Sequence, residues 1–346
     1  MKQSFVHSLS RLLAAALLFA LPALAAENQE LERAKSHFRA GRIDEAVALL
    51  EKLISTSTLS KPDRVEAWEF LAFCNVAKQN EERVQTSFAE ILKLDAAYEP
   101  RDAYLSHPAV MRGWATARKE VLGNYWQLTS EAGIKTVAIL DFDNNSINDA
   151  NKLANLGKGL ADIVITDLAA LTKLKVVERE RIQFITEEIQ RSEATVQGQP
   201  LVNPEFAVRL GKLLGAQSVL IGSYMKIDKK LRIDVRLVKT ETSEIIKTDH
   251  VEGSPDEVLN LAKKLAIKIS ENLEVAVNKV DEERIDRLQQ KEIPLEAAMA
   301  YSEALNMLDQ ERYHDARTML ARALKLAPSF KMAQDKLMLL HTFQKS

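Results

Sequence analysis

Two carboxylates follow a short apolar run in the middle of the sequence. Asp141 and Asp143 come directly after Val137–Leu140, and Asn145 stands two positions further on. A carboxylate pair after a buried strand begins some Mg²⁺-dependent phosphatase sites, so a metal-dependent hydrolytic or small-ligand-binding domain is one hypothesis. That chemistry also needs a later Lys and a second carboxylate pair, and no such cluster stands out. A polar structural turn formed by Asp141, Asp143 and Asn145 is therefore favoured.

Two other ligand-binding motifs fail on their spacing. The calcium loop D-x-D-x-N-G requires Gly at its sixth position and Glu at its twelfth, where this chain has Ser146 and Lys152. The segment Gly157–Gly159 contains a Lys between two glycines but lacks the G-x-x-x-x-G-K-[ST] spacing that directs backbone N–H groups at phosphates. The two glycines predict instead a close approach of the chain at the start of a helix.

The remaining reactive side chains do not form a recognisable site. The six His residues are scattered and show no metal-ligand spacing. Cys74 is the only cysteine, so no intrachain disulfide can form, and its place beside Phe73 on an apolar helix face predicts a buried structural thiol. Four arginines are interleaved with acidic residues: Arg179, Arg181, Arg232 and Arg236. We expect these arginines to form a solvated mixed face, and we expect no catalytic residue, metal site or cofactor.

The elements that position these residues lie in a central region, residues 135–276. Predicted strands cover residues 136–140, 176–177, 219–221, 231–238 and 244–251. Predicted helices begin near residues 156, 181, 204 and 255. Asn203 is an expected helix cap, and Ser254–Glu257 has the sequence of a capping box. The order β-α-β-α-α-β-β-β-α predicts a mixed sheet with helices packed on it.

Six segments of this region together resemble a known family. They are residues 137–145, 156–162, 176–179, 210–216, 221–224 and 231–244. The set is similar to the CsgG family, the curli secretion component, and the flagellum-associated FlgO family and the N-terminal domain of TolB have a similar design. The resemblance implies a periplasmic α/β domain without catalysis, often forming rings at the outer membrane.

Two departures from that family limit what the resemblance implies. CsgG is a lipoprotein, whereas no lipid-acceptor Cys follows the N-terminal apolar run of this chain. CsgG also inserts hairpins into the membrane, and the corresponding stretch Glu187–Asn203 is highly charged and contains no aromatic residue. A ring-forming outer-membrane channel component is therefore a third hypothesis that the sequence disfavours.

Helical repeats flank the central region on both sides. Residues 27–125 have the tetratricopeptide pattern, in which small residues such as Ala34 and Ala46 permit close helix crossings around a turn at Gly41. Residues 280–346 contain a charged helix and one further repeat. The candidate packing or binding surface of the repeats consists of Trp68, Leu71, Ala72, Ala304, Ala316 and Leu320. About three repeats are needed to bury their apolar faces, so these must be covered by each other, by the central domain or by a partner.

The N-terminus predicts export. Residues 1–26 combine a basic start, a short apolar run and small residues ending near Ala25, which is typical of a cleavable signal peptide. The run is too short to be a membrane span, so we expect a soluble periplasmic protein, associated with the outer membrane only through what it binds. The formal net charge of −2 gives no bulk attraction to nucleic acid.

The predicted fold class is α+β: a central mixed α/β sandwich-like domain flanked by α-helical tetratricopeptide-type repeats. The predicted function is that of a non-enzymatic scaffold that assists the assembly or secretion of cell-envelope structures. Its expected partners are other envelope proteins bound through the helical repeats, and a homo-oligomer is a further option. We expect no nucleic-acid partner and no direct membrane span.

Overall fold

A computed structural model describes most of the chain after the predicted signal. The described residues are 28–55, 59–125, 134–147, 150–171, 173–192, 204–275, 281, 283 and 293–343. The signal at residues 1–26, the expected cap at Asn203 and most of the charged segment after residue 280 lie outside them. The described residues divide into two compact units, here taken separately: 28–101, 112–125 and 341–343 form the first, and 102–111 with the described part of 134–340 form the second.

The first unit consists of paired helices. They are residues 28–39, α2 (Ile43–Ser55), α3 (Lys61–Ala77), α4 (Glu81–Leu94) and the part of α6 (Pro108–Leu122) from residue 112 onward. Gly41 has a φ of 72°, which an L side chain adopts only with strain, and it permits the tight turn before α2. Ala34 and Ala46 are fully buried, as expected for small residues at a close helix crossing.

Aromatic rings and a close helix contact fill the interior of the first unit. The ring of Phe38 meets that of Phe70 edge-on at 5.6 Å, and Phe73 meets Phe343 in the same way at 5.6 Å. Helix α6 approaches α4 so closely that a Cβ at Gly113 would lie 2.5 Å from Cγ1 of Val84. Helix α6 therefore covers the second repeat pair of this unit.

The second unit is built on one mixed sheet. Its strands are β1 (Lys135–Ile139), β2 (Asp143–Asn144), β3 (Leu174–Val176), β4 (Ser218–Ile227), β5 (Lys230–Lys239) and β6 (Ile245–Gly253). Their order is β3-β1-β4-β5-β6, with β2 beside β4. Strands β1, β2 and β3 run parallel to their neighbours, whereas β4, β5 and β6 form an antiparallel meander. Because side chains alternate along a strand, Leu231, Ile233, Val235 and Leu237 are buried on one face.

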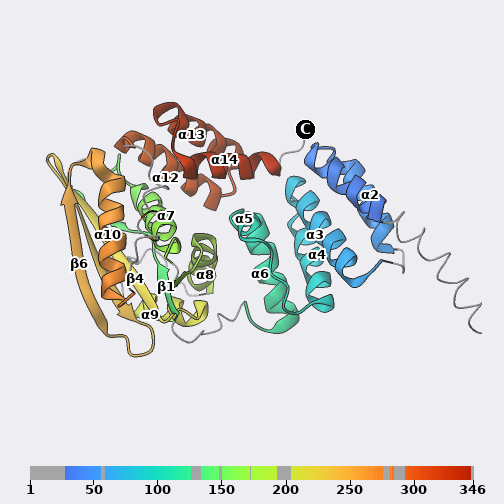
Figure 1. Ribbon diagram of the computed structural model, residues 1–346, viewed down its shortest axis with the longest axis horizontal. Helices are drawn as coiled ribbons and strands as arrows, with labels where there is room; N and C mark the ends of the chain where they lie inside the picture. The colour runs from blue at the N-terminus through green and yellow to red at the C-terminus, as the bar shows by residue number, and fades with distance from the viewer. Residues whose placement is uncertain are drawn as a thin grey trace, which may run out of the picture. The chain divides into compact units, whose positions relative to one another are not determined.

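Helices pack on both faces of this sheet. They are α7 (Leu156–Ala169), α8 (Arg179–Ser192), α9 (Pro204–Leu214) and α10 (Val258–Asn272), with a short α5 (Asp102–Leu105) before them in the sequence. Helices α7 and α10 contact each other, and α10 lies along the sheet, where it packs on β6 and β5 (Figure 1). Helix α9 contacts β4 and β5 from the opposite face, where a Cβ at Gly211 would meet Val219 at 2.6 Å.

The C-terminal repeat packs on the α/β domain within this unit. It comprises α12 (Leu295–Asp309), α13 (Tyr313–Leu326) and α14 (Lys331–Thr342) (Figure 1). Helix α12 lies against α7. The two approach so closely that a Cβ at Gly159 would stand 1.9 Å from the hydroxyl oxygen of Ser302. The central domain therefore supplies the cover that this repeat needs.

The α+β class and the helical flanks are confirmed. The capping box at Ser254 is also present, with its hydroxyl accepting from the Asp256 N–H and the Glu257 carboxylate accepting from the Ser254 N–H. One local expectation was incomplete, since Asp143 and Asn144 of the predicted polar turn form the short strand β2. Among the described helices, none has both the length and the hydropathy that a membrane crossing requires.

Candidate functional site

The side chain of Asp141 faces two cations of the same unit. Asp141 follows β1, and its Oδ2 lies 3.2 Å from Nζ of Lys158 near the start of α7. Its Oδ1 lies 3.8 Å from Nε of Arg179, the first residue of α8. Strand β1 and the two helices thus bring together residues that the sequence analysis treated as separate features.

A second carboxylate completes this arrangement from the C-terminal repeat. Asp309, the last residue of α12, accepts hydrogen bonds from Nη1 and Nη2 of Arg179 at 2.9 and 2.7 Å, and from Nζ of Lys158 at 2.7 Å. We call Asp141, Lys158, Arg179 and Asp309 the charged cluster. Its two cations and two carboxylates sum to zero charge, and the fork of Arg179 matches the Asp309 carboxylate bidentately.

Burial makes the charges of this cluster depend on one another. The side chains of Arg179 and Asp309 are only 3% and 7% exposed. Burial alone would raise the pKa of Asp309, but the charges and hydrogen bonds of Arg179 and Lys158 lower it to about 2. Burial would likewise lower the pKa of Lys158, whereas the carboxylates of Asp141 and Asp309 raise it. Asp309, Lys158 and Arg179 are thus held in their charged forms, so none of these three groups is prepared to exchange a proton near neutral pH.

Further polar contacts join the same parts of the second unit. The hydroxyl of Tyr301 on α12 donates to Oδ2 of Asp162 on α7 at 2.5 Å. Nζ of Lys336 on α14 pairs with the buried carboxylate of Glu180 on α8. Burying such groups is costly unless they are paired, so these contacts fix how the C-terminal repeat packs on the α/β domain.

The two other residues of the predicted polar turn have different roles. Asp143 is half-buried in β2 and pairs in register with Ser223 of β4. Asn145 is exposed, and its backbone N–H donates to the Tyr224 carbonyl at 2.8 Å. Within the described residues, no group of three or more His, Cys, Asp or Glu side chains is placed to hold a metal ion.

Most of the candidate repeat residues lie inside the helix packing. Five of them are buried: Leu71, Ala72, Ala304, Ala316 and Leu320. Trp68 on α3 is half-buried and is the member of the set that reaches the surface. The buried five are therefore packing residues, and Trp68 is the one available to a partner.

Sequence reasoning missed the charged cluster and misplaced two arginines. Arg179 and Arg181 are buried, so the prediction that they belong to a solvated mixed face was wrong. The glycines on either side of Lys158 predicted a close approach of the chain, but their spacing indicates neither the burial of Lys158 nor its carboxylate partners. The prediction for Cys74 is confirmed, since the thiol is fully buried and burial raises its pKa to about 12.

Two family models match the chain. Residues 120–232 match the model described as curli production assembly/transport component CsgG, and residues 31–83 match a tetratricopeptide repeat model. The chain thus combines a CsgG-like domain with tetratricopeptide-type repeats. A comparison with curated proteins finds no match.

The similar solved structures include two LpoB C-terminal domains and one lipoprotein, all with low sequence identity. The C-terminal domain of LpoB from Salmonella enterica has 14% identity and a TM-score of 0.25, covering 44% of this chain and 98% of that one. Lipoprotein GNA1162 from Neisseria meningitidis has 12% identity and a TM-score of 0.29, and the match covers 40% of this chain and 99% of that one. The LpoB C-terminal domain from Escherichia coli has 16% identity and a TM-score of 0.25, covering 44% and 98%.

Proposed function

We propose that this chain is a non-enzymatic interaction protein of the periplasm that assists the assembly or secretion of cell-envelope structures. The observation that carries the proposal is the combination of a CsgG-like domain and tetratricopeptide-type repeats in one chain. Tetratricopeptide helices build surfaces that bind other proteins, and the matched CsgG family is described as an assembly and transport component. An adaptor between envelope proteins uses both modules.

The state of Asp141 supports a role without catalysis. Its carboxylate faces Lys158 and Arg179, which also hold Asp309 in place. A general acid or base needs a pKa near the working pH, and a metal-binding carboxylate needs an open position beside it, whereas the carboxylate of Asp141 is paired with two cations. The structural role of Asp141 is therefore to complete the packing of α7 and α8 against the end of α12.

The first unit supplies the surface we assign to partners. Trp68 is a half-buried aromatic residue on α3, and aromatic residues of this kind are common anchors in protein interfaces. The helix at residues 28–39 carries Lys35, whose Nζ lies 2.6 Å from carboxylate oxygens of Glu32 and of Glu66 on α3. A rigid helix pair with one partly exposed aromatic is suited to a helix or an extended segment of another protein.

Export is the remaining part of the proposal. It rests on the signal sequence at residues 1–26, which predicts cleavage near Ala25. The mature chain would then reach an oxidising compartment with Cys74 as its only thiol, and burial protects that thiol from oxidation.

In-cell crosslinking tests this proposal. The full-length chain with a C-terminal affinity tag is expressed in its native cells, treated briefly with formaldehyde and purified under denaturing conditions. We expect a tagged chain whose mass corresponds to cleavage near Ala25, together with a reproducible adduct to another envelope protein. A chain that keeps residues 1–26, or one that gives no reproducible adduct, would contradict the proposal.

A further inference from the structure

One face of the antiparallel meander is only partly covered by the helices that the structure describes. Helix α9 packs on this face at the start of β4, where Gly211 approaches Val219. Beyond that end the strand register places three cross-strand pairs on the same face: Ile221 with Arg236, Ser223 with Asp234, and Met225 with Arg232. Strand β6 continues the rows with Thr248 and His250. These residues are far more polar than those on the face covered by α10.

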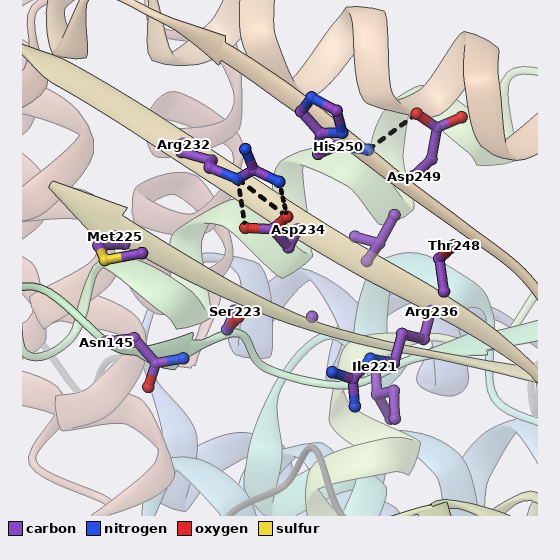
Figure 2. A pocket seen from close by; sticks show the side chains of 12 residues that line it. Asn145, Ile221, Ser223, Met225, Arg232, Asp234, Arg236, Thr248, Asp249 and His250 are labelled. Atoms are coloured by element: carbon purple, nitrogen blue, oxygen red, sulfur yellow. Dashed lines mark hydrogen bonds and ion pairs between the residues drawn. The ribbon is translucent and has the colours of Figure 1, made fainter.

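This part of the sheet forms an open groove of about 440 Å³ (Figure 2). Asn145 lies at one border, β5 runs through its middle, and Thr248 and His250 of β6 lie on the other side (Figure 2). The groove is comparable in size to pockets that hold a small ligand or a few residues of a peptide. Strand backbones form its base, so its shape is set by the sheet.

Most charges in and around the groove are already paired. Arg232 donates three hydrogen bonds of 2.7 to 3.0 Å to the carboxylate of Asp234, drawn as dashed lines in Figure 2. Nζ of Lys230 lies 3.3 Å from Oε1 of Glu252. Arg236 differs from these residues, because in the described part of the chain its exposed guanidinium forms no ion pair. Among the residues that the structure describes, the groove therefore presents one uncompensated positive charge, that of Arg236.

Apolar side chains adjoin this charge. Ile221, directly opposite Arg236, is 1% exposed, and Met225 is half-buried further along β4. Ile227 lies on the same face at the end of β4 and is 46% exposed. A cation beside an apolar row fits a segment that carries an acidic residue and an apolar residue close together.

We propose that this groove binds an acidic, extended segment of a partner protein, with a carboxylate of that segment paired to Arg236. Apolar side chains of the segment pack on Met225 and on the exposed Ile227 at the end of β4, and the hydroxyls of Ser223 and Thr248 are available for its polar groups. The proposal rests on the function as an interaction protein and adds a second binding surface, separate from Trp68. A nucleic acid is a poorer fit, because its phosphate backbone needs several free cations and the described residues of the groove offer one.

Calorimetric titration of the purified mature chain tests this proposal. The probe is an acetylated, amidated eight-residue peptide of alternating Glu and Val, compared with a matching Lys and Val peptide. We expect the Glu peptide to bind and the Lys peptide to give no heat. Arg236→Ala should weaken the binding at least about tenfold, as expected when a charge-assisted pair is lost. The control Arg322→Ala removes an exposed arginine of α13 outside the groove and should leave binding unchanged.

Three outcomes would overturn the proposal. They are equal binding of both peptides, no binding of the Glu peptide, and equal loss of binding in the two arginine variants. Light scattering adds a fourth, because self-association that Arg236→Ala abolishes would make a second copy of the chain the occupant. A circular dichroism spectrum and melting temperature equal to those of the wild type show that each variant is folded. A negative peptide titration would not change the result expected from the in-cell crosslinking experiment. The groove proposal and the proposed function can therefore be refuted separately.

Discussion

Replacing Asp309 by Asn tests whether the charged cluster stabilises the second unit. Asp309 is 7% exposed and accepts the fork of Arg179 and the ammonium of Lys158. Asn has nearly the same shape but no charge. The variant leaves two cations with Asp141 as the remaining carboxylate of the cluster, at 3.2 and 3.8 Å. The structure therefore changes by one charge and almost no volume.

The expected magnitude follows from the burial of the two cations. Removing one partner of a buried ion pair costs about 3–5 kcal/mol because it leaves an uncompensated charge in a medium of low polarity. Asn retains one hydrogen-bond acceptor for Arg179, so we expect the free energy of unfolding to fall by about 3 kcal/mol, the lower end of that range. For a unit of this size, each kcal/mol lowers the melting temperature by about 2–4 °C, which gives a decrease of about 10 °C.

Differential scanning calorimetry of the full chain measures this decrease. Asp315→Asn is the matched control, because Asp315 lies on the next helix and pairs with Arg312 at the surface. Exposed pairs contribute about 0–1 kcal/mol to the free energy of unfolding, so the control should shift the melting temperature by no more than about 4 °C. Equal shifts in the two variants would refute the claim that the cluster fixes the C-terminal repeat on the α/β domain.

Three further predictions use the same chain. The pKa of Asp309 is about 2 in the folded chain, below its ordinary 3.8, so the ionised carboxylate stabilises the fold fully above pH 5 and this stabilisation is lost as the pH falls toward 2. Urea unfolding between pH 5 and pH 2 should therefore show that the free energy of unfolding of the wild type falls by about 2 kcal/mol more than that of Asp309→Asn. Gly159→Ala should lower the free energy of unfolding by about 2 kcal/mol in calorimetry, because the added Cβ would lie 1.9 Å from Oγ of Ser302. Adding Ser302→Ala to this variant should recover part of that free energy. Cys74 should react with Ellman's reagent only after unfolding, since the native thiol is buried.

Local patterns predicted most of the second unit. The alternation of Leu231, Ile233, Val235 and Leu237 with polar residues defines a half-buried strand, and it also places Arg232, Asp234 and Arg236 together on the other face. The capping box and the Gly41 turn are equally local signals. Strand β2 was missed because two residues are too few for a periodic pattern, and its pairing with β4 depends on tertiary structure.

The charged cluster could not be predicted for a different reason. Asp141 and Asp309 are far apart in the sequence, and they share Lys158 and Arg179 only because α12 packs on α7. Helix periodicity shows that α12 has a face to bury but not which surface covers it. The glycines at 157 and 159 indicated a close approach, and the structure identifies the partners as the Phe142 backbone and Ser302.

Site-specific photocrosslinking tests the central claim most directly, namely that the repeats bind another envelope protein. A benzoylphenylalanine residue replaces Trp68, which is half-buried and of similar size, and a second chain carries it at the exposed Lys93 on α4. After illumination of intact cells, we expect a discrete adduct with one envelope protein from the Trp68 position and none from the Lys93 position. The same adducts from both positions, or none from Trp68 in a folded and exported chain, would contradict the account.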